Sequence, residues 1–510
     1  MKRILSVLLV LSMILTSLFA LSACTQPEED NKGVTAEEFK NNAQAALIKV
    51  SQNTMDAFFT DDAGIDSIVE EALKAGSAKL EFEAREELIG ADLKIGETIY
   101  FDAANKKYVS DTEVTFDGET LAGRVFVDKN GVAINGSDIL GSDRTIAINP
   151  ATLVSGFLDS ALAKLLVAGG DSAEIDDETK EIIETSFSEF KKQYDKLFSD
   201  ETNAEFNKYA NELYTAMGLA VTEEKVDGAD VIVLTLTINN DNLETVFDKV
   251  FSIAKAQMPG TESLPEEAVV DFEQAMEEAE AAIDEALAMI DENAELSVSS
   301  KLYVLKKEGK MLKGSLNGEL KFIGEIAAQM PTDTMTVSAE MTYSDTENKV
   351  VLNADMGEQK FDATVTLKKT GTEYKLSVNV GDGKGADINA LNITYKYNEN
   401  GSFTLAVDVY GDPDRTVLTV SGTVTKTDKT AKIEITSVAI NAPEFEEEIS
   451  FKLALTFDKS AKAPALPSDA KDIVELTEED WAAIMEEIQG SKLFEYMGSF
   501  SGSADTAPIE

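Results

Sequence analysis

The sequence predicts an α+β fold, namely a large, curved, mostly antiparallel β-sheet (half-barrel-like) with amphipathic helices packed on one face. Three observations predict it. Apolar and polar residues alternate with a period of two through most of residues 296–460, as in strands with one wet face. A second stretch, from Lys79 to Ile134, alternates in the same way. Apolar residues recur at helical spacing before, between and after these stretches.

Residues 1–23 predict a signal peptide. Basic residues in Met1-Lys2-Arg3 precede a mostly apolar run, Ile4 to Ala20, which is shorter than the ~20 residues needed to span a bilayer. The run leads into Leu21-Ser22-Ala23-Cys24, which resembles the lipobox of bacterial lipoproteins, where the peptidase cleaves just before the cysteine. The resemblance implies that Cys24 carries diacylglycerol and palmitate-like acyl chains. These chains would anchor the mature protein to the extracytoplasmic face of a bacterial membrane.

The polar composition of residues 24–34 predicts a tether. Residues 35–260 are predicted to form helices plus an antiparallel meander. Thr35 and Glu38 form a capping box at the start of the first helix. Within the meander, turn signals such as Asn130-Gly131 separate the strands. The continuous apolar run Val231–Leu234 predicts a later strand that is covered on both faces.

Residues 261–295 predict an acidic amphipathic helix. The segment from Glu262 to Glu295 lacks Lys and Arg, and its apolar residues recur three and four positions apart from Val269 to Ile290. Such a seam packs on a partner helix or on a sheet. Because the seam is only about three heptads long, packing on the protein's own sheet is favoured over a coiled coil.

Residues 296–460 predict an antiparallel β-sheet region, with hairpin turns at Asn317-Gly318, Thr370-Gly371 and Asn400-Gly401. An open sheet of roughly ten strands tends to curl or to split, so a barrel, a half-barrel or a sandwich is expected. Residues 461–498 predict a linker and a C-terminal helix that is capped by Thr477 and Asp480. Residues 499–510 predict a disordered tail.

Composition excludes several classes of function. The formal net charge is −49, which argues against binding to nucleic acid. The chain has no histidine, so the commonest general base and the Ser-His-Asp triad are missing. The single cysteine, Cys24, is assigned to lipidation, which leaves no thiol for catalysis or for a disulfide. We therefore expect a protein that is not an enzyme and has no cofactor.

Several short motifs resemble catalytic or metal-binding motifs, but we assign them no catalytic or metal-binding role. Ser-x-x-Lys begins at Ser188, Ser252 and Ser468, and Lys369-Thr370-Gly371 resembles a motif of penicillin-binding enzymes. In that family the motif lies on a strand lining the site, whereas here it falls in a predicted hairpin turn. The acidic loops 381–387 and 411–414 lack EF-hand spacing, and ordinary hairpin loops explain them equally well. No catalytic or metal-binding residue is assigned.

The predicted layout is similar in outline to the half-barrel carriers that bind lipids or lipoproteins in bacterial envelopes. This similarity is one of layout and rests on no motif. It implies a cell-surface lipoprotein that acts as a non-enzymatic binding module for an apolar ligand or an envelope protein partner. The alternative is a structural or interaction lipoprotein with a fully packed core and no ligand. An envelope hydrolase fits the missing histidine least.

Lipidation of Cys24 can be tested in the native host. The Cys24→Ser variant should lack the acyl chains and should retain the apolar run Ile4 to Ala20, because the peptidase cleaves just before the cysteine. Mass spectrometry of the N-terminal peptide measures the modification. A Ser22→Ala variant, which keeps a small residue in the lipobox, should remain lipidated. A wild-type chain found in the cytosol, or with an unmodified sulfur, would contradict this interpretation.

Overall fold

The structure is a computed structural model. It describes residues 33–59, 61–84, 93–116, 119–140, 142–167, 177–198, 201–257, 274, 281–285, 287–288, 290–328, 332–357, 359–381, 387–409, 416–442, 445–449, 451–489 and 491. The predicted signal peptide, most of the acidic segment 261–295 and the predicted tail 499–510 lie outside the described residues. The chain divides into two compact units. Unit 1 takes its described residues from Met1–Asp62, Asp200–Lys396 and Leu405–Val417, and unit 2 from Ala63–Ser199, Tyr397–Thr404 and Leu418–Glu510.

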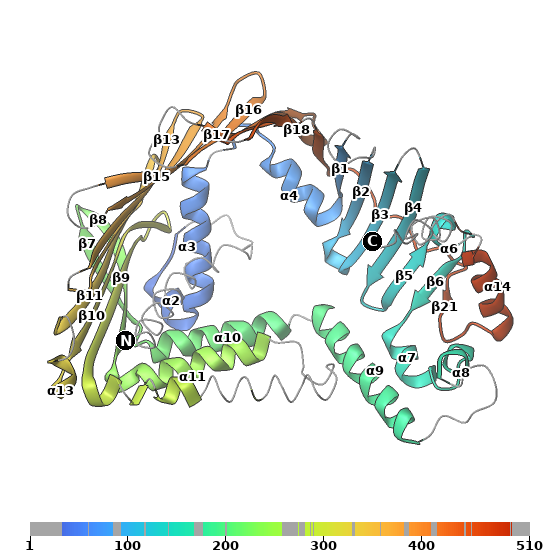
Figure 1. Cartoon of the computed structure of the whole chain (residues 1–510), viewed down its shortest axis with the longest axis horizontal. Coiled ribbons are helices and arrows are strands. Elements are labelled where there is room, and N and C mark those ends of the chain that lie inside the picture. The colour runs from blue at the N-terminus through green and yellow to red at the C-terminus, as the bar shows by residue number, and fades with distance from the viewer. Residues whose placement is uncertain are drawn as a thin grey trace, which may run out of the picture. The chain divides into compact units, whose positions relative to one another are not determined.

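Unit 1 combines helices with an antiparallel meander in which each strand from β7 to β15 pairs with the next along the chain (Figure 1). Its helices are α2 (Ala36–Asn41), α3 (Ala43–Phe58), α10 (Glu201–Ala216), α11 (Asn240–Gln257) and α13 (Gly324–Ala327). Its strands are β7 (Ala220–Val226), β8 (Ala229–Asn239), β9 (Ala294–Leu305), β10 (Lys310–Phe322), β11 (Thr334–Thr342), β12 (Glu347–Asp355), β13 (Lys360–Thr370), β14 (Glu373–Gly381) and β15 (Asp387–Tyr397).

The core of unit 1 lies between its helices and strands β8 to β11. Alternate residues of β8 and β9 enter the core together with side chains of α2, α3, α10 and α11. Val231, Ile232, Val233 and Leu234 are all buried, which confirms that this strand is covered on both faces. In the described part of the acidic segment, Ile283 and Ile290 of the predicted seam pack against the same core.

The prediction of a hairpin turn at Asn317-Gly318 is wrong. Both residues lie inside β10, where Gly318 pairs with Val298 of β9 and Val337 of β11. A Cβ atom on Gly318 would lie 2.8 Å from Val337 Cγ1, so the glycine permits close packing rather than a turn. The turns at Gly371 and Gly401 are present, with φ angles of 61° and 85° that favour glycine.

Unit 2 combines a further set of strands with helices around them (Figure 1). Its helices are α4 (Asp66–Ala75), η2 (Ala103–Asn105), α6 (Ser137–Leu140), α7 (Pro150–Gly156), α8 (Ala161–Val167), α9 (Asp177–Phe198) and α14 (Glu478–Gln489). Its strands are β1 (Ser77–Ala84), β2 (Leu93–Asp102), β3 (Lys107–Phe116), β4 (Glu119–Asp128), β5 (Gly131–Asn135), β6 (Thr145–Ile148), β18 (Thr430–Ala442), β19 (Phe445–Ile449), β20 (Phe451–Asp458) and β21 (Lys471–Asp472). Strands β16 (Ser402–Val409) and β17 (Thr416–Lys426) contribute residues to both units.

The sheet of unit 2 is antiparallel in the order β17-β18-β20-β1-β2-β3-β4-β5-β6, and β21 adds a parallel pair to β6. The hairpin between β4 and β5 turns at Asn130-Gly131, as the sequence predicts. Together the two units confirm an α+β protein that is rich in antiparallel sheet. None of the described helices is both long enough and apolar enough to span a bilayer.

The C-terminal helix α14 begins at the predicted cap. The backbone N–H of Thr477 donates to Asp480 Oδ2 across 3.1 Å, and the N–H of Asp480 donates back to Thr477 Oγ1 across 3.1 Å. The backbone hydrogen bond from Thr477, followed by the ammonium group of Lys471, lowers the pKa of Asp480 to about 2. Ile484 of this helix is buried, as its helical spacing predicts.

A buried hydrogen bond in unit 1 gives a test of this core. Tyr214 Oη donates to Gln44 Oε1 across 3.1 Å, and both residues are 1% exposed. Tyr214→Phe should lower the free energy of unfolding by about 1–3 kcal/mol, because it leaves the buried amide oxygen without its donor. Urea unfolding of the purified chain measures the change.

The double variant Gln44→Met with Tyr214→Phe provides the control. It removes both partners and should recover part of the lost stability, since no buried acceptor then lacks a donor. A single variant as stable as the wild type would show that this hydrogen bond does not stabilise the core.

Candidate functional site

Strands β1 to β6 of unit 2 present two chemically different faces. Successive residues of a strand point to opposite faces, and the strand registers set which residues are neighbours on each face. We define the polar face by Lys79, Glu81, Glu83, Lys94, Gly96, Thr98, Asp111, Glu113, Thr115, Ala122, Arg124 and Asn135. We define the apolar face by Ala78, Leu80, Phe82, Leu93, Ile95, Ile99, Tyr108, Val114, Leu121, Val125, Ile134 and Ile146, with Glu97, Ser110, Thr112 and Gly123 among them.

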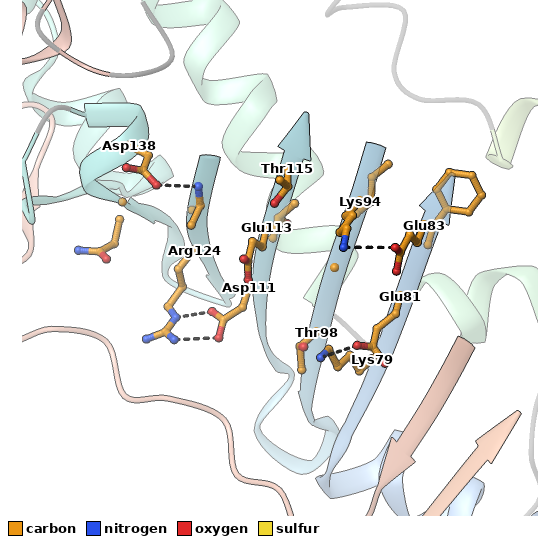
Figure 2. Close-up of a pocket in the computed structure, with 18 of the residues that line it drawn as sticks. Lys79, Glu81, Glu83, Lys94, Thr98, Asp111, Glu113, Thr115, Arg124 and Asp138 are labelled. Atoms are coloured by element: carbon orange, nitrogen blue, oxygen red, sulfur yellow. Dashed lines mark hydrogen bonds and ion pairs between the residues drawn. The ribbon is translucent and has the colours of Figure 1, made fainter. Parts of the chain in front are cut away.

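An open groove of about 650 Å³ lies over the polar face (Figure 2). Its floor includes a cross-strand row in which Gly96 and Ala122 flank Glu113. The rows on either side carry longer charged side chains, such as Arg124 and Lys94. The groove therefore arises where small residues in one row meet long residues in the rows beside it.

The charged residues of the groove are largely paired with one another, as Figure 2 shows. The Arg124 guanidinium donates to both carboxylate oxygens of Asp111, with Nη2 2.8 Å from Oδ2. These hydrogen bonds raise the pKa of Arg124 above its usual value. Lys79 and Lys94 form ion pairs with Glu81 and Glu83, at 3.0 and 3.2 Å. Because these side chains are solvent-exposed, the pairs contribute little stability.

The polar face is covered at one end. Next to the Asp111–Arg124 pair, the same face continues into Val109, Phe126 and Ala133, which are almost fully buried. Ala463 packs against this cluster, so the predicted linker closes that end of the sheet. The remainder of the polar face has the character of an ordinary solvated sheet surface.

The apolar face differs because its side chains stay in contact with solvent. Leu80 and Tyr108 are 36% and 38% exposed. The other apolar residues that define this face are half-buried, and none of them reaches full burial. In unit 1, by contrast, Ile232 and Ile238 on β8 are 0% and 2% exposed. Full burial is thus found in one part of unit 1, whereas Val350, Val365 and Val378 on β12 to β14 of that unit are half-buried like the apolar face of unit 2.

Among the described residues, helices pack on the apolar face at its two ends. Ile68 and Ala72 of α4 pack against Phe457 of β20 and its neighbours. At the other edge of the same face, Phe157 and Phe187 pack near Ile148 of β6. The centroids of the two phenylalanine rings are 4.8 Å apart. The middle strands between these two clusters carry the half-buried side chains.

A short polar row crosses this otherwise apolar surface. Glu97 on β2 lies opposite Leu80 on β1 and Thr112 on β3. Ser110 Oγ donates to Glu97 Oε1 across 3.1 Å. On β4 the row continues at Gly123, which has no side chain. A carboxylate is therefore held among apolar neighbours.

The residues singled out by sequence motifs are not brought into one site. Cys24 lies outside the described residues. Ser188 lies in α9 and Ser252 in α11, where its hydroxyl donates to Asp248 O of the same helix across 2.8 Å. Ser468 precedes β21, and Lys369 Nζ donates to Phe58 O across 3.2 Å. These contacts are those of ordinary surface and structural residues.

Metal-binding residues are not clustered in the described part of the chain, where no group of three or more Asp, Glu, Cys or His could hold an ion. Most of the two acidic loops, at 382–386 and 410–415, lies outside that part. Comparisons with models of protein families, with curated proteins and with solved structures find no match for this chain. Function must therefore be inferred from the two faces of the unit 2 sheet.

Sequence reasoning identified these strands but not the site. The alternation of Leu80 and Phe82 with Glu81 and Glu83 was visible in the sequence. It could not show that the apolar side would lack full cover, because the covering depends on where distant helices pack. Glu97 breaks the apolar series between Ile95 and Ile99, and that break was the signal available in the sequence.

Gly96 gives a test of how the groove is built. A Cβ atom at Gly96 would meet no atom nearer than Glu113 O, at 4.0 Å. Gly96→Thr should therefore raise the free energy of unfolding by about 0.5–1 kcal/mol, because glycine in a strand interior is costly and threonine favours strands. The same change at Gly318, where the Cβ atom would meet Val337, should lower it. Chemical denaturation measures both, and a destabilised Gly96→Thr variant would contradict an open floor.

Proposed function

We propose that this chain is a lipid-anchored, non-enzymatic binding module at the extracytoplasmic face of a bacterial membrane, and that it binds an apolar ligand on the apolar face of unit 2. The observation that carries the proposal is the incomplete burial of that face, from Leu80 to Ile146. Soluble proteins rarely leave large contiguous apolar patches open unless the patches bind something.

The energetics of such binding are favourable. Burial of apolar surface contributes roughly 25 cal/mol per Å², and complete burial of one aliphatic or aromatic side chain contributes ~1.5–3 kcal/mol. A ligand that covers Phe82, Ile95 and Val114 completes burial that the chain itself leaves partial. The gain comes from residues that already occupy fixed strand positions, so little ordering is required on binding.

The anchor and the layout support the same proposal. The lipobox-like Leu21-Ser22-Ala23-Cys24 and the polar stretch 24–34 would hold the described units close to a membrane, which is a source of apolar ligands. A curved half-barrel with helices on one face is the arrangement that we propose for the sheet. Contacts of α3 with β10 and of α11 with β8 agree with it.

The alternative, a structural or interaction lipoprotein with a packed interior, is favoured by one observation in unit 1. The void bordered by Leu47, Tyr214 and Leu234 has a volume of about 10 Å³, which is about the space that one water requires. An acyl chain does not fit between the helices and strands at that point. We therefore assign the ligand to the open face of unit 2 rather than to the helix–sheet layer of unit 1.

A lipid with a fluorescent acyl chain tests the proposal. Leu80→Gln should weaken its binding about tenfold, because the loss of roughly 1.4 kcal/mol of apolar contact corresponds to one decade of affinity. The matched control is Phe361→Gln on β13 of unit 1, where the side chain is 38% exposed and should not contribute. Fluorescence titration of the purified chain measures both affinities.

Two results would count against the proposal. If the wild type binds no acyl probe and carries no co-purifying lipid in native mass spectrometry, the structural alternative is preferred. If Phe361→Gln weakens binding as much as Leu80→Gln does, the ligand does not occupy the apolar face.

A further inference from the structure

Glu97 is the carboxylate of the apolar face. Among the described side chains that β1 to β6 place on this face, no other Asp or Glu occurs. Ile95 and Ile99 precede and follow it on the same face of β2, and Leu80 lies across from it on β1. The cations of these strands, which are Lys79, Lys94, Lys107 and Arg124, belong to the opposite face. Glu97 thus has apolar neighbours on β1 and β2 and the hydroxyl residues Ser110 and Thr112 on β3, and among the described side chains of β1 to β6 no cation lies on its face.

The hydrogen bonding of Glu97 is incomplete within the described residues. Ser110 Oγ donates to Oε1 across 3.1 Å, and this is the one hydrogen bond that the described residues make to the carboxylate. Thr112 lies directly opposite on β3, and beyond it Gly123 places no side chain over β4. The polar row therefore has space above Gly123, and Oε2 of Glu97 has no hydrogen bond from the described residues.

A ligand that covers this row removes water from a charge. Burying a carboxylate without a partner is costly, whereas a charge-assisted hydrogen bond from a cation offsets much of that cost. An anionic head group would be repelled, and a neutral one would leave the charge uncompensated. On these grounds, the charge that a ligand brings to Glu97 would affect its affinity for the face.

We propose that the apolar face selects amphiphiles with an ammonium head group, which donates to Glu97 while the hydrocarbon chain lies on neighbouring apolar rows. The inference rests on the proposed function, because it names the ligand class for the same face. The row formed by Phe82, Ile95, Val114 and Leu121 lies two residues along the strands from Glu97 and receives the chain. The net charge of −49 adds a general attraction for cations.

Three single-chain probes test the selection: dodecylammonium, dodecanol and dodecanoate, each below its micelle concentration. Isothermal titration of the full chain should give the tightest binding for the ammonium, by about tenfold over the alcohol, and the weakest for the carboxylate. Glu97→Gln should bring the ammonium and the alcohol to similar affinity. Glu97→Asp, which keeps the charge, should retain the preference for the ammonium.

Glu113→Gln is the matched control. It removes the same charge from the next strand, but Glu113 faces the groove on the opposite side of the sheet. This variant should retain the full preference for ammonium. Equal loss of preference in Glu97→Gln and Glu113→Gln would mean that net charge alone attracts the cation, and the inference would be overturned.

The remaining outcomes separate the inference from the proposed function. If all three probes bind with equal affinity, the selection by Glu97 is overturned while the apolar binding face stands. If none of the three binds, both are overturned. Retention of the ammonium preference in Glu97→Gln, with circular dichroism unchanged from wild type, also overturns the inference.

Discussion

The register of the antiparallel strands in unit 2 is the constraint on which its surfaces depend. Each strand sends alternate residues to opposite faces, so a slip of one residue would exchange the charged and apolar sets. The pairing of Asp111 with Arg124 across β3 and β4 requires the observed register, as does the pairing of Glu83 with Lys94 across β1 and β2. The same register aligns Phe82, Ile95, Val114 and Leu121 in one row on the other face. The groove and the apolar face are therefore two consequences of one alignment.

In both units the described helices complete the burial of only some of the strands. In unit 1, α2, α3, α10 and α11 contribute to a core in which residues such as Val246 and Val304 are fully buried. In unit 2, α4 and the α7–α9 cluster cover the ends of the apolar face and leave the middle half-buried. Burial in unit 1 is also incomplete, because Val350, Val365 and Val378 on β12 to β14 are half-buried. Binding of an apolar ligand to the middle of the apolar face would complete burial there and would stabilise unit 2.

Local signals in the sequence predicted the elements that depend on local chemistry. The cap of Thr477 and Asp480 and the turn at Gly371 involve neighbours in sequence, and both were found as expected. Asn317-Gly318 has the same turn signal, but its glycine serves a contact with Val337 on another strand, which no local pattern reveals. The candidate site was beyond prediction for a similar reason. The alternation of residues along β2 places Glu97 on the apolar face. Whether Glu97 can contact a ligand depends on how little of that face the helices cover, and no local pattern shows this.

An exposed apolar face also favours non-specific association, including association with a second copy of the same chain. Two copies stacked through this face would bring their Glu97 carboxylates into a dry interface, where like charges without a cation are strongly unfavourable. The ion pairs on the polar face do not relieve this, because Lys79 and Lys94 belong to the other side of the sheet. The charge that we propose to favour an ammonium-headed amphiphile would therefore also disfavour self-association. A purely apolar face would bind more ligands and would also aggregate, so a single carboxylate in that position improves selectivity in two ways.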